Sequence, residues 1–311
     1  MKIGFLFPGQ GAQTIGMGKD LYEKYPEYRK IYEKVNEITG RKIDVLTFNS
    51  NEEELNQTKN TQITILTMSL AILEILKKEN IQVEATMGLS LGEYTALIHS
   101  GVLSFDDGIK IVQKRGELMQ NLCPSGDWSM AAIIGLEGAK INEICTNITS
   151  GFVRPANYNC PGQIVISGEK NAVLEAIEKC KKEGAKRAIE LNTSGPFHTC
   201  KLKDASEELT KELALVKIGN FNNTKVIKNL DGKPYKVQDD VKQILANHII
   251  NPVRFADGLQ TMLDMGIDIF VEIGPGKTLA GFVKRTSREV KIFNINDVQT
   301  LESTLGGLKN E

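Results

Sequence analysis

The strongest constraint on the fold is the alternation of strand and helix signals, which runs through the first 125 residues and returns after residue 194. Short apolar runs predict strands at 2–7, 84–89, 225–230 and 268–274. Longer amphipathic or apolar segments predict helices at 16–35, 61–78, 104–123, 203–214, 239–265 and 277–285, whereas 40–55 is the least regular piece. This alternation predicts an α/β fold in which helices flank a parallel sheet.

Residues 126–192 follow a different order. The pattern predicts strands at 128–135, 152–159, 163–168 and 185–191, with helices at 139–148 and 172–184. Strand, helix, strand, strand, helix, strand is the order of a ferredoxin-like α+β unit. We therefore expect a large α/β domain of residues 1–125 and 194–311, with a small domain of residues 126–193 inserted into it.

Composition excludes several classes of function. The chain of 311 residues has 38 basic and 39 acidic residues, so its net charge of -1 gives no overall attraction to nucleic acid or to an anionic membrane, which leaves only local charged patches. Its 5 cysteines form no C-x-x-C pair, so we expect no disulfide framework and no metal site. A reducing cytoplasm fits this cysteine usage. Pro8 and Gly9 interrupt the first apolar run before a signal peptide could form, and the apolar segment 63–76 is too short and too polar to span a bilayer.

Residues 88–92 read GLSLG and match the pattern G-x-S-x-G. In α/β hydrolases this pattern is a sharp strand-to-helix turn that presents the serine side chain at its tip. The same five residues also occur by chance in many chains, so the pattern alone leaves Ser90 either as a nucleophile or as a serine in a turn.

A serine nucleophile needs a base, and the chain has only 3 histidines. His99 follows Ser90 by nine residues on the same predicted helix, too far to reach it, so we assign it to structure. His198 lies in a Gly-Pro loop, where it is either a base or a surface histidine. His248 ends a predicted helix before Pro252; the helix C-terminus favours its protonated form, and a capping role is the alternative.

The glycine-rich stretch PGQGAQ, at 8–13, follows the first predicted strand and so lies at the edge of the sheet where α/β folds bind ligands. A dinucleotide loop is one interpretation, but Thr14 stands where that motif needs its third glycine. The other is an oxyanion hole formed by the backbone amides of Gln10 and Leu91.

Arg115 lies on the helix predicted to begin at Ser104. Most helical arginines are solvated. The functional alternative is a bidentate clamp on a substrate carboxylate, for which the planar guanidinium is suited and lysine is not.

Seven motifs together give a more specific prediction. They are FPGQGAQ (7–13), GLSLGEY (88–94), KRGELM (114–119), ANYNCPGQIVISG (156–168), GPFH (195–198), NPVRF (251–255) and EIGPGKTL (272–279). In this order, and over nearly the whole chain, they resemble the malonyl-CoA:acyl carrier protein transacylases. The resemblance implies a large α/β hydrolase-like domain, an inserted ferredoxin-like domain and an active site between them.

The resemblance also implies a role for each matching residue. Ser90 is expected to be the nucleophile and His198 the base, with the amides of Gln10 and Leu91 as the oxyanion hole. Arg115 is expected to hold the free carboxylate of the malonyl group. No catalytic aspartate is needed, because in this family a backbone carbonyl usually orients the histidine.

One further position and two departures follow from the same resemblance. Phe197 is expected in the pocket, in a motif associated with malonyl over methylmalonyl selection. Leu89 stands where the family usually has histidine, which puts pocket shape, rate or acyl preference in doubt. In the family, the residue whose carbonyl orients the base is commonly glutamine, and His248 occupies the matching position. A backbone role tolerates this change, although a second imidazole near Ser90 and His198 could alter the pH dependence of the pair.

The function implied is transfer of a malonyl group from malonyl-CoA to the phosphopantetheine thiol of acyl carrier protein, through a malonyl-serine ester, for fatty acid biosynthesis. No permanently bound cofactor is expected, and the family precedent is a monomer. Because carrier proteins are acidic, we expect a basic docking surface among Lys181, Lys182, Lys186, Arg187, Lys284 and Arg285. The alternatives are service to a polyketide synthase, a serine thioesterase or esterase, and a non-catalytic carrier-binding scaffold.

Overall fold

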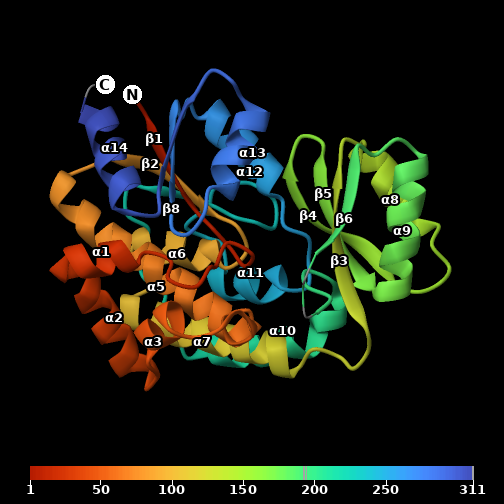
Figure 1. The fold of residues 1–311 in the computed structure, drawn as a ribbon, viewed down its shortest axis with the longest axis horizontal. Helices are drawn as coiled ribbons and strands as arrows, with labels where there is room; N and C mark the ends of the chain where they lie inside the picture. Colours follow the sequence, from red (N-terminus) through yellow and green to blue (C-terminus); the bar gives the residue numbers. More distant parts are fainter. Residues whose placement is uncertain (192, 194, 310–311) are drawn as a thin grey trace.

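A computed structural model describes residues 1–191, 193 and 195–309, which form two units, each built around one sheet (Figure 1). The larger unit takes its strands from both ends of the chain. The smaller unit, green and yellow-green at the right of Figure 1, takes all of its strands from residues 128–191. The predicted fold class, a parallel α/β sheet with a separate small α+β unit, is confirmed.

The larger sheet is parallel throughout and has the strand order β7-β2-β1-β8-β9. Its strands are β1 (Ile3–Phe7), β2 (Val83–Gly88), β7 (Lys225–Ile227), β8 (Ile269–Ile273) and β9 (Lys291–Ile295). All residues of β1 and β8 are buried, as expected for central strands with helices on both faces. Because the strands are parallel, the loops after β1, β2, β7 and β8 meet at one edge of the sheet.

Alternate side chains of β1 pack into opposite layers. Phe5 and Phe7 belong to a core cluster with α2, α5, α6 and α7, whereas Leu6 packs with α12 and α13. The helices of this unit are α1 (Lys19–Lys24), α2 (Pro26–Thr39), α3 (Ile43–Phe48), α4 (Glu52–Leu55), α5 (Thr58–Leu76), α6 (Gly92–His99), α7 (Phe105–Asn121), α10 (Lys203–Ala214), α11 (Val241–His248), α12 (Phe255–Asp264), α13 (Thr278–Thr286) and α14 (Val298–Lys309). In the part of the chain that the structure describes, none of the helices has the length and hydrophobicity needed to span a lipid bilayer.

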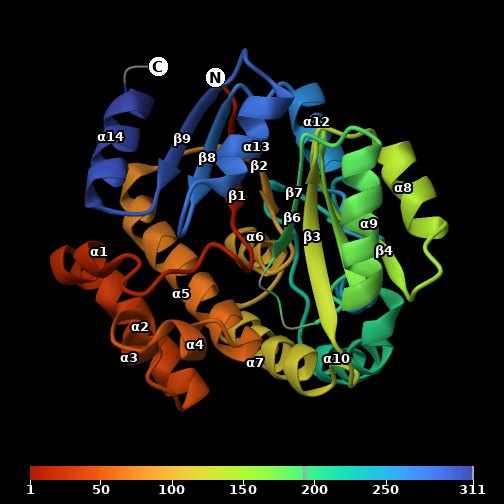
Figure 2. The ribbon, with the colours of Figure 1, turned by 45° about the vertical axis from the view of Figure 1, so that its right-hand side comes forward.

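The smaller sheet is antiparallel, with the order β4-β5-β3-β6. Its elements are β3 (Trp128–Ile134), α8 (Gly138–Thr146), β4 (Val153–Cys160), β5 (Gln163–Glu169), α9 (Lys170–Lys182) and β6 (Arg187–Leu191). Figure 2 shows α8 and α9 on the outer side of this sheet. The element order and strand order agree with the predicted ferredoxin-like unit.

The helix boundaries differ from the predictions where proline or capping decides them. The helix predicted over 16–35 is two helices, because Pro26 lacks a backbone N–H and begins α2 at its first position. The segment 40–55, predicted to be irregular, contains α3 and α4, and Asn51 caps α4 by accepting a hydrogen bond from the Glu54 amide. Strand β9 and helix α14 were not predicted.

The division into domains 1–125 with 194–311 and 126–193 stays a prediction, and its boundary at Ser194 lies outside the described residues. The two units are joined by backbone pairing as well as by the chain. Val253, before α12, donates to the carbonyl of Ala156 at 2.8 Å and accepts from the amide of Tyr158 at 2.8 Å. Strand β4 of the smaller unit is therefore hydrogen-bonded to the larger one.

Two glycines allow α6 to pass very close to the sheet. A Cβ atom on Gly92 would lie 2.1 Å from the carbonyl oxygen of Phe7, and one on Gly88 would lie 1.8 Å from the carbonyl carbon of Gly92. Both contacts are with backbone atoms, which cannot move aside as a flexible side chain can. The spacing of glycines in G-x-S-x-G is thus a packing requirement of the turn.

We predict that Gly92→Ala lowers the free energy of unfolding by about 2–3 kcal/mol, because the added methyl overlaps the backbone of β1. The matched control is Gly281→Ala on α13, where an added Cβ meets nothing within 4 Å; it is expected to raise the free energy of unfolding by about 0.5–1 kcal/mol. Chemical denaturation of both variants measures the difference. Equal effects of the two substitutions would contradict the close approach of α6.

Candidate active site

Ser90 lies at the tip of the turn between β2 and α6, with φ of +53°. This left-handed conformation is unfavourable for a residue with a side chain, so neighbouring contacts must hold it. Asn229, two residues beyond β7, provides two of them. Its Oδ1 accepts from the Ser90 amide at 2.8 Å, and its Nδ2 donates to the Gly88 carbonyl at 2.7 Å. The serine is thereby presented at the carboxyl edge of the sheet.

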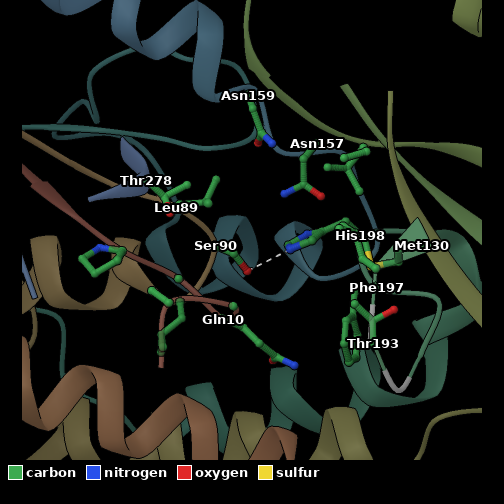
Figure 3. Close-up of a pocket in the computed structure, with 18 of the residues that line it drawn as sticks. Gln10, Leu89, Ser90, Met130, Asn157, Asn159, Thr193, Phe197, His198 and Thr278 are labelled. Carbon is green, nitrogen blue, oxygen red and sulfur yellow. Dashed lines mark hydrogen bonds between the residues drawn. The ribbon is translucent and has the colours of Figure 1, made fainter. Parts of the chain in front are cut away.

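His198 faces Ser90 across the pocket (Figure 3), with its Nε2 2.8 Å from the Ser90 Oγ. Its Nδ1 lies 3.0 Å from the backbone carbonyl of His248. A carbonyl can only accept, so the ring proton is on Nδ1 and Nε2 is free to accept from the serine hydroxyl. The structure therefore brings Ser90 and His198 together in the arrangement of a nucleophile and its base.

The surroundings of His198 keep its imidazole neutral. The side chain is 4% exposed, and its backbone φ of +59° is again left-handed. Burial first, and then the nearby positive charge of Arg115, lower the pKa of His198 to about 4, against the opposing effect of the His248 and Asn251 backbone. The interpretation of His198 as a surface loop histidine is wrong, because the ring is enclosed.

His248 lies at the end of α11 and is fully buried, 5.0 Å from the His198 ring between centroids. Its Nδ1 is 3.2 Å from Oε2 of Glu93, but neither ring nitrogen makes a hydrogen bond to a described residue. Burial holds the pKa of His248 well below its usual value. The prediction that the helix end favours its protonated form is wrong, since desolvation outweighs the helix dipole.

Arg115 is 1% exposed, so the interpretation as an ordinary solvated arginine is also wrong. Its Nη1 donates to Oε1 of Gln62 at 2.6 Å, and its Nη2 donates to Oγ of Ser90 at 3.0 Å. The guanidinium carbon lies 5.4 Å from the centre of the Tyr94 ring. Its Nε has no partner among the described residues. A buried cation beside the serine, with an unused donor, is suited to an anionic ligand.

A pocket of about 240 Å³ opens above Ser90 and is lined by both units. Leu89 and Phe197 contribute to its walls, as does Gln10 from the loop after β1 (Figure 3). Within the described part of the chain, the backbone amides of Gln10 and Leu91 donate no hydrogen bond to another backbone group or side chain. They are therefore available as the two donors of an oxyanion hole.

His99 has the structural place predicted for it. It ends α6 and packs beside Phe5 and Phe7, with ring centroids at 5.5 Å and 6.2 Å. Burial lowers its pKa to about 4. His99 lines none of the pocket above Ser90.

Sequence reasoning missed three residues that support the site. Gln62 accepts a hydrogen bond from the Arg115 guanidinium and so orients it, and Asn229 accepts one from the Ser90 amide and so stabilises the turn. Glu93 is completely buried; burial raises its pKa to about 7, against the hydrogen bond that it accepts from the Tyr235 hydroxyl at 2.6 Å. The available signals were a glutamine inside an apolar helix and an acid directly after G-x-S-x-G. Asn229 had no such signal.

Comparisons with known proteins agree with this geometry. The family model "Acyl transferase domain" matches residues 4–308. A malonyl CoA-acyl carrier protein transacylase of Bacillus subtilis is 42% identical over 312 residues, covering 100% of this chain and 98% of the relative. The chain belongs to the malonyl CoA-acyl carrier protein transacylase family. A Staphylococcus aureus member of this family is 40% identical over 314 residues, covering 100% of this chain and 99% of its own.

Solved structures of transacylases superpose closely on this fold. That of the malonyl CoA-acyl carrier protein transacylase from Clostridium perfringens has a TM-score of 0.95 at 41% identity and covers 100% of this chain and 98% of its own. A malonyl-transacylase solved in complex with its type II PKS acyl-carrier protein has a TM-score of 0.95 at 34% identity, covering 99% of this chain and 100% of its own. The predicted family, with its hydrolase-like fold, is confirmed.

We predict that none of the 3 imidazoles gains a proton between about pH 8 and pH 6, where an exposed histidine would titrate. All three lie in surroundings that lower their pKa values, mainly through desolvation. Nitrogen NMR of protein labelled on histidine follows the ring signals, and His99→Gln assigns one of them. A midpoint near 6.5 for either remaining ring would show that the site is wetter than its geometry implies.

Proposed function

We propose that this protein transfers a malonyl group from malonyl-CoA to the phosphopantetheine thiol of acyl carrier protein, through an ester on Ser90. One observation carries the proposal. The Ser90 hydroxyl lies 2.8 Å from the base nitrogen of His198 and 3.0 Å from a donor of the buried Arg115. A nucleophile and a site for a carboxylate are thus adjacent, as the transfer of a dicarboxylic acyl group requires.

In the first half-reaction, the Ser90 oxygen attacks the thioester carbonyl carbon while its proton passes to Nε2 of His198. The backbone amides of Gln10 and Leu91 donate hydrogen bonds to the oxyanion of the tetrahedral intermediate. When this intermediate collapses, the carbon–sulfur bond breaks and the departing coenzyme A thiolate takes the proton from His198. The products are malonyl-Ser90 and coenzyme A.

The second half-reaction uses the same groups in reverse. The thiol of the carrier's phosphopantetheine gives its proton to His198 and attacks the ester carbonyl. The carbon–oxygen bond breaks, and His198 returns the proton to the Ser90 oxygen. No permanently bound cofactor takes part, and the scheme is ping-pong.

Arg115 and Phe197 are proposed to select the acyl group. The Nη2 and unpartnered Nε of Arg115 offer parallel donors to the free carboxylate. Phe197 is buried in the pocket wall directly before the base, where it limits the space for a branched acyl group. His248 acts through its backbone carbonyl only, which fits a histidine where the family commonly has glutamine.

The carrier protein is proposed to dock on a surface beside the pocket that is formed by basic residues of both units. The candidates are all exposed: Lys181, Lys182, Lys186, Arg187, Lys284 and Arg285. Arg285 connects them to the pocket, since its Nη1 donates at 2.7 Å to Oε1 of Gln163, a residue of the pocket lining. An unchanged KM for the carrier after charge reversal at low salt would remove this surface from the proposal.

We further propose that the malonyl-loaded acyl carrier protein supplies fatty acid synthesis in the cytoplasm, and that the enzyme acts as a monomer. The solved complex of a related transacylase with a type II PKS acyl-carrier protein favours polyketide synthesis as the second candidate pathway. The same site chemistry serves both, because each pathway presents the malonyl group on a phosphopantetheine thiol.

The test of the proposed function is the intact mass of the protein after mixing with malonyl-CoA, followed by addition of carrier protein bearing phosphopantetheine. We expect a malonyl adduct that disappears as the carrier gains the same mass, with Ser90→Ala as the control that forms no adduct. An adduct lost only to water would instead identify a thioesterase or esterase. No adduct at all would favour a non-catalytic carrier-binding scaffold.

We predict that Arg115→Ala raises the rate of acetyl transfer relative to malonyl transfer by at least about tenfold, because the carboxylate loses its charged partner. Arg115→Lys is the matched variant, since it keeps the charge but not the bidentate geometry. Its ratio of acetyl to malonyl transfer is expected to lie between those of the wild type and Arg115→Ala. Competition between acetyl-CoA and malonyl-CoA measures the ratio. An unchanged ratio in Arg115→Ala would remove this residue from acyl selection.

A further inference from the structure

The acidic residue directly after G-x-S-x-G is enclosed beside the catalytic pair and lies outside the pocket lining. Glu93 is in the first turn of α6 and its side chain is fully buried. It has no part in the transfer steps proposed above. A buried carboxyl group is unfavourable unless its contacts compensate for the lost hydration, so its presence this close to Ser90 calls for a function.

Both oxygens of Glu93 contact residues that support the catalytic pair. Its Oε1 accepts from the Tyr235 hydroxyl at 2.6 Å, and its Oε2 accepts from the Asn229 amide at 3.3 Å. The side chain of Asn229 in turn holds the Ser90 turn. Oε2 also lies 3.2 Å from Nδ1 of His248, whose carbonyl orients the base. One carboxyl group therefore lies where the support of the nucleophile meets the support of the base.

The titratable side chains around Glu93 and its partner Tyr235 come from α6, α7, α11 and the segment after β7: Tyr94, Arg115, His248, Lys228, Asp231 and Asp239. Lys228 is paired with Asp231 and Asp239. The charge of Arg115 favours the ionised form of Glu93, but burial is the larger effect and raises its pKa to about 7. The carboxyl group is therefore protonated below about pH 7 and ionised above it.

His248 brings this carboxyl group close to the base. Its Nδ1 contacts Glu93, and its ring centroid is 5.0 Å from that of His198. In each half-reaction His198 takes up a proton and becomes a cation. A carboxylate at the place of Glu93 attracts this cation, and a buried site screens the attraction less than water does. A protonated Glu93 is neutral and gives no such attraction.

We propose that Glu93 is a positioning residue for acyl transfer: it joins the segment that holds Ser90 to the helix end that orients His198, and its ionised form supports the cation that His198 becomes. This inference rests on the proposed function. Because the ionised form is present above the pKa of Glu93, malonylation of Ser90 is expected to become faster as the pH rises through about 7.

The experiment measures the rate constant for malonylation of Ser90 by rapid quench and intact mass, at several malonyl-CoA concentrations, between about pH 5.5 and pH 8.5. In the wild type we expect the rate constant to rise with a midpoint at about pH 7. Glu93→Gln keeps nearly the same shape without the charge. We expect it to lose this midpoint and to be about tenfold slower at about pH 8, with an unchanged KM because Glu93 lies outside the pocket.

Glu272→Gln is the matched control. Glu272 is also buried, and burial raises its pKa to about 7, but its Oε2 accepts from the Ala280 amide in α13 and so lies away from the supports of the catalytic pair. We expect this variant to keep the midpoint at about pH 7, because the titrating group beside His248 is unchanged.

Tyr235→Phe tests the same carboxyl group without replacing it, in case Glu93→Gln prevents folding. The Tyr235 hydroxyl stabilises the ionised form of Glu93, so its loss raises the pKa of Glu93 and moves the midpoint to higher pH. A midpoint that is absent in the wild type, retained in Glu93→Gln, lost in Glu272→Gln or unmoved in Tyr235→Phe would overturn the proposal. A wild type that forms no malonyl-Ser90 at any pH would contradict the proposed function itself, which separates the two failures.

Discussion

The site depends on one hydrogen bond, from Nδ1 of His198 to the backbone carbonyl of His248. Because a carbonyl only accepts, this contact fixes the ring proton on Nδ1 and leaves Nε2 as the base for Ser90. No carboxylate takes part in it. Burial and the charge of Arg115 then keep the imidazole neutral, with a pKa of about 4, so the base is in its reactive form at neutral pH. Since the acceptor is a backbone atom, this hydrogen bond itself does not require a particular side chain at 248.

The acceptor belongs to a segment that also joins the two units of the fold. Val253, five residues after His248, pairs with β4. This pairing fixes the pocket wall formed by the smaller sheet relative to the catalytic base, His198. Ser90 is held separately, through Asn229 and the crowded passage of Gly92 over β1. The nucleophile, the base and the far wall of the pocket are thus each held by contacts to the backbone.

Much of this arrangement could be predicted from the sequence, because hydrophobic periodicity and short motifs depend on interactions between residues that are close together in the chain. Alternating strand and helix signals gave the parallel sheet, and G-x-S-x-G gave the turn at Ser90. The environment of single side chains could not be predicted. Nothing local distinguishes Arg115, which is buried, from a solvated arginine on the same helix. His248 was expected to be protonated, because helix ends are visible in a sequence and the packing that desolvates a ring is not. Gln62 and Asn229 matter only through partners distant in the chain.

The central claim is that Ser90 holds the acyl group between two separate half-reactions. The most direct measurement is isotope exchange: labelled coenzyme A is mixed with unlabelled malonyl-CoA and the protein, with no carrier present. A ping-pong mechanism predicts that label enters malonyl-CoA, because malonyl-Ser90 forms and is attacked by the labelled thiol. Exchange that required the carrier protein would contradict the covalent intermediate and would indicate direct transfer within a complex of both substrates.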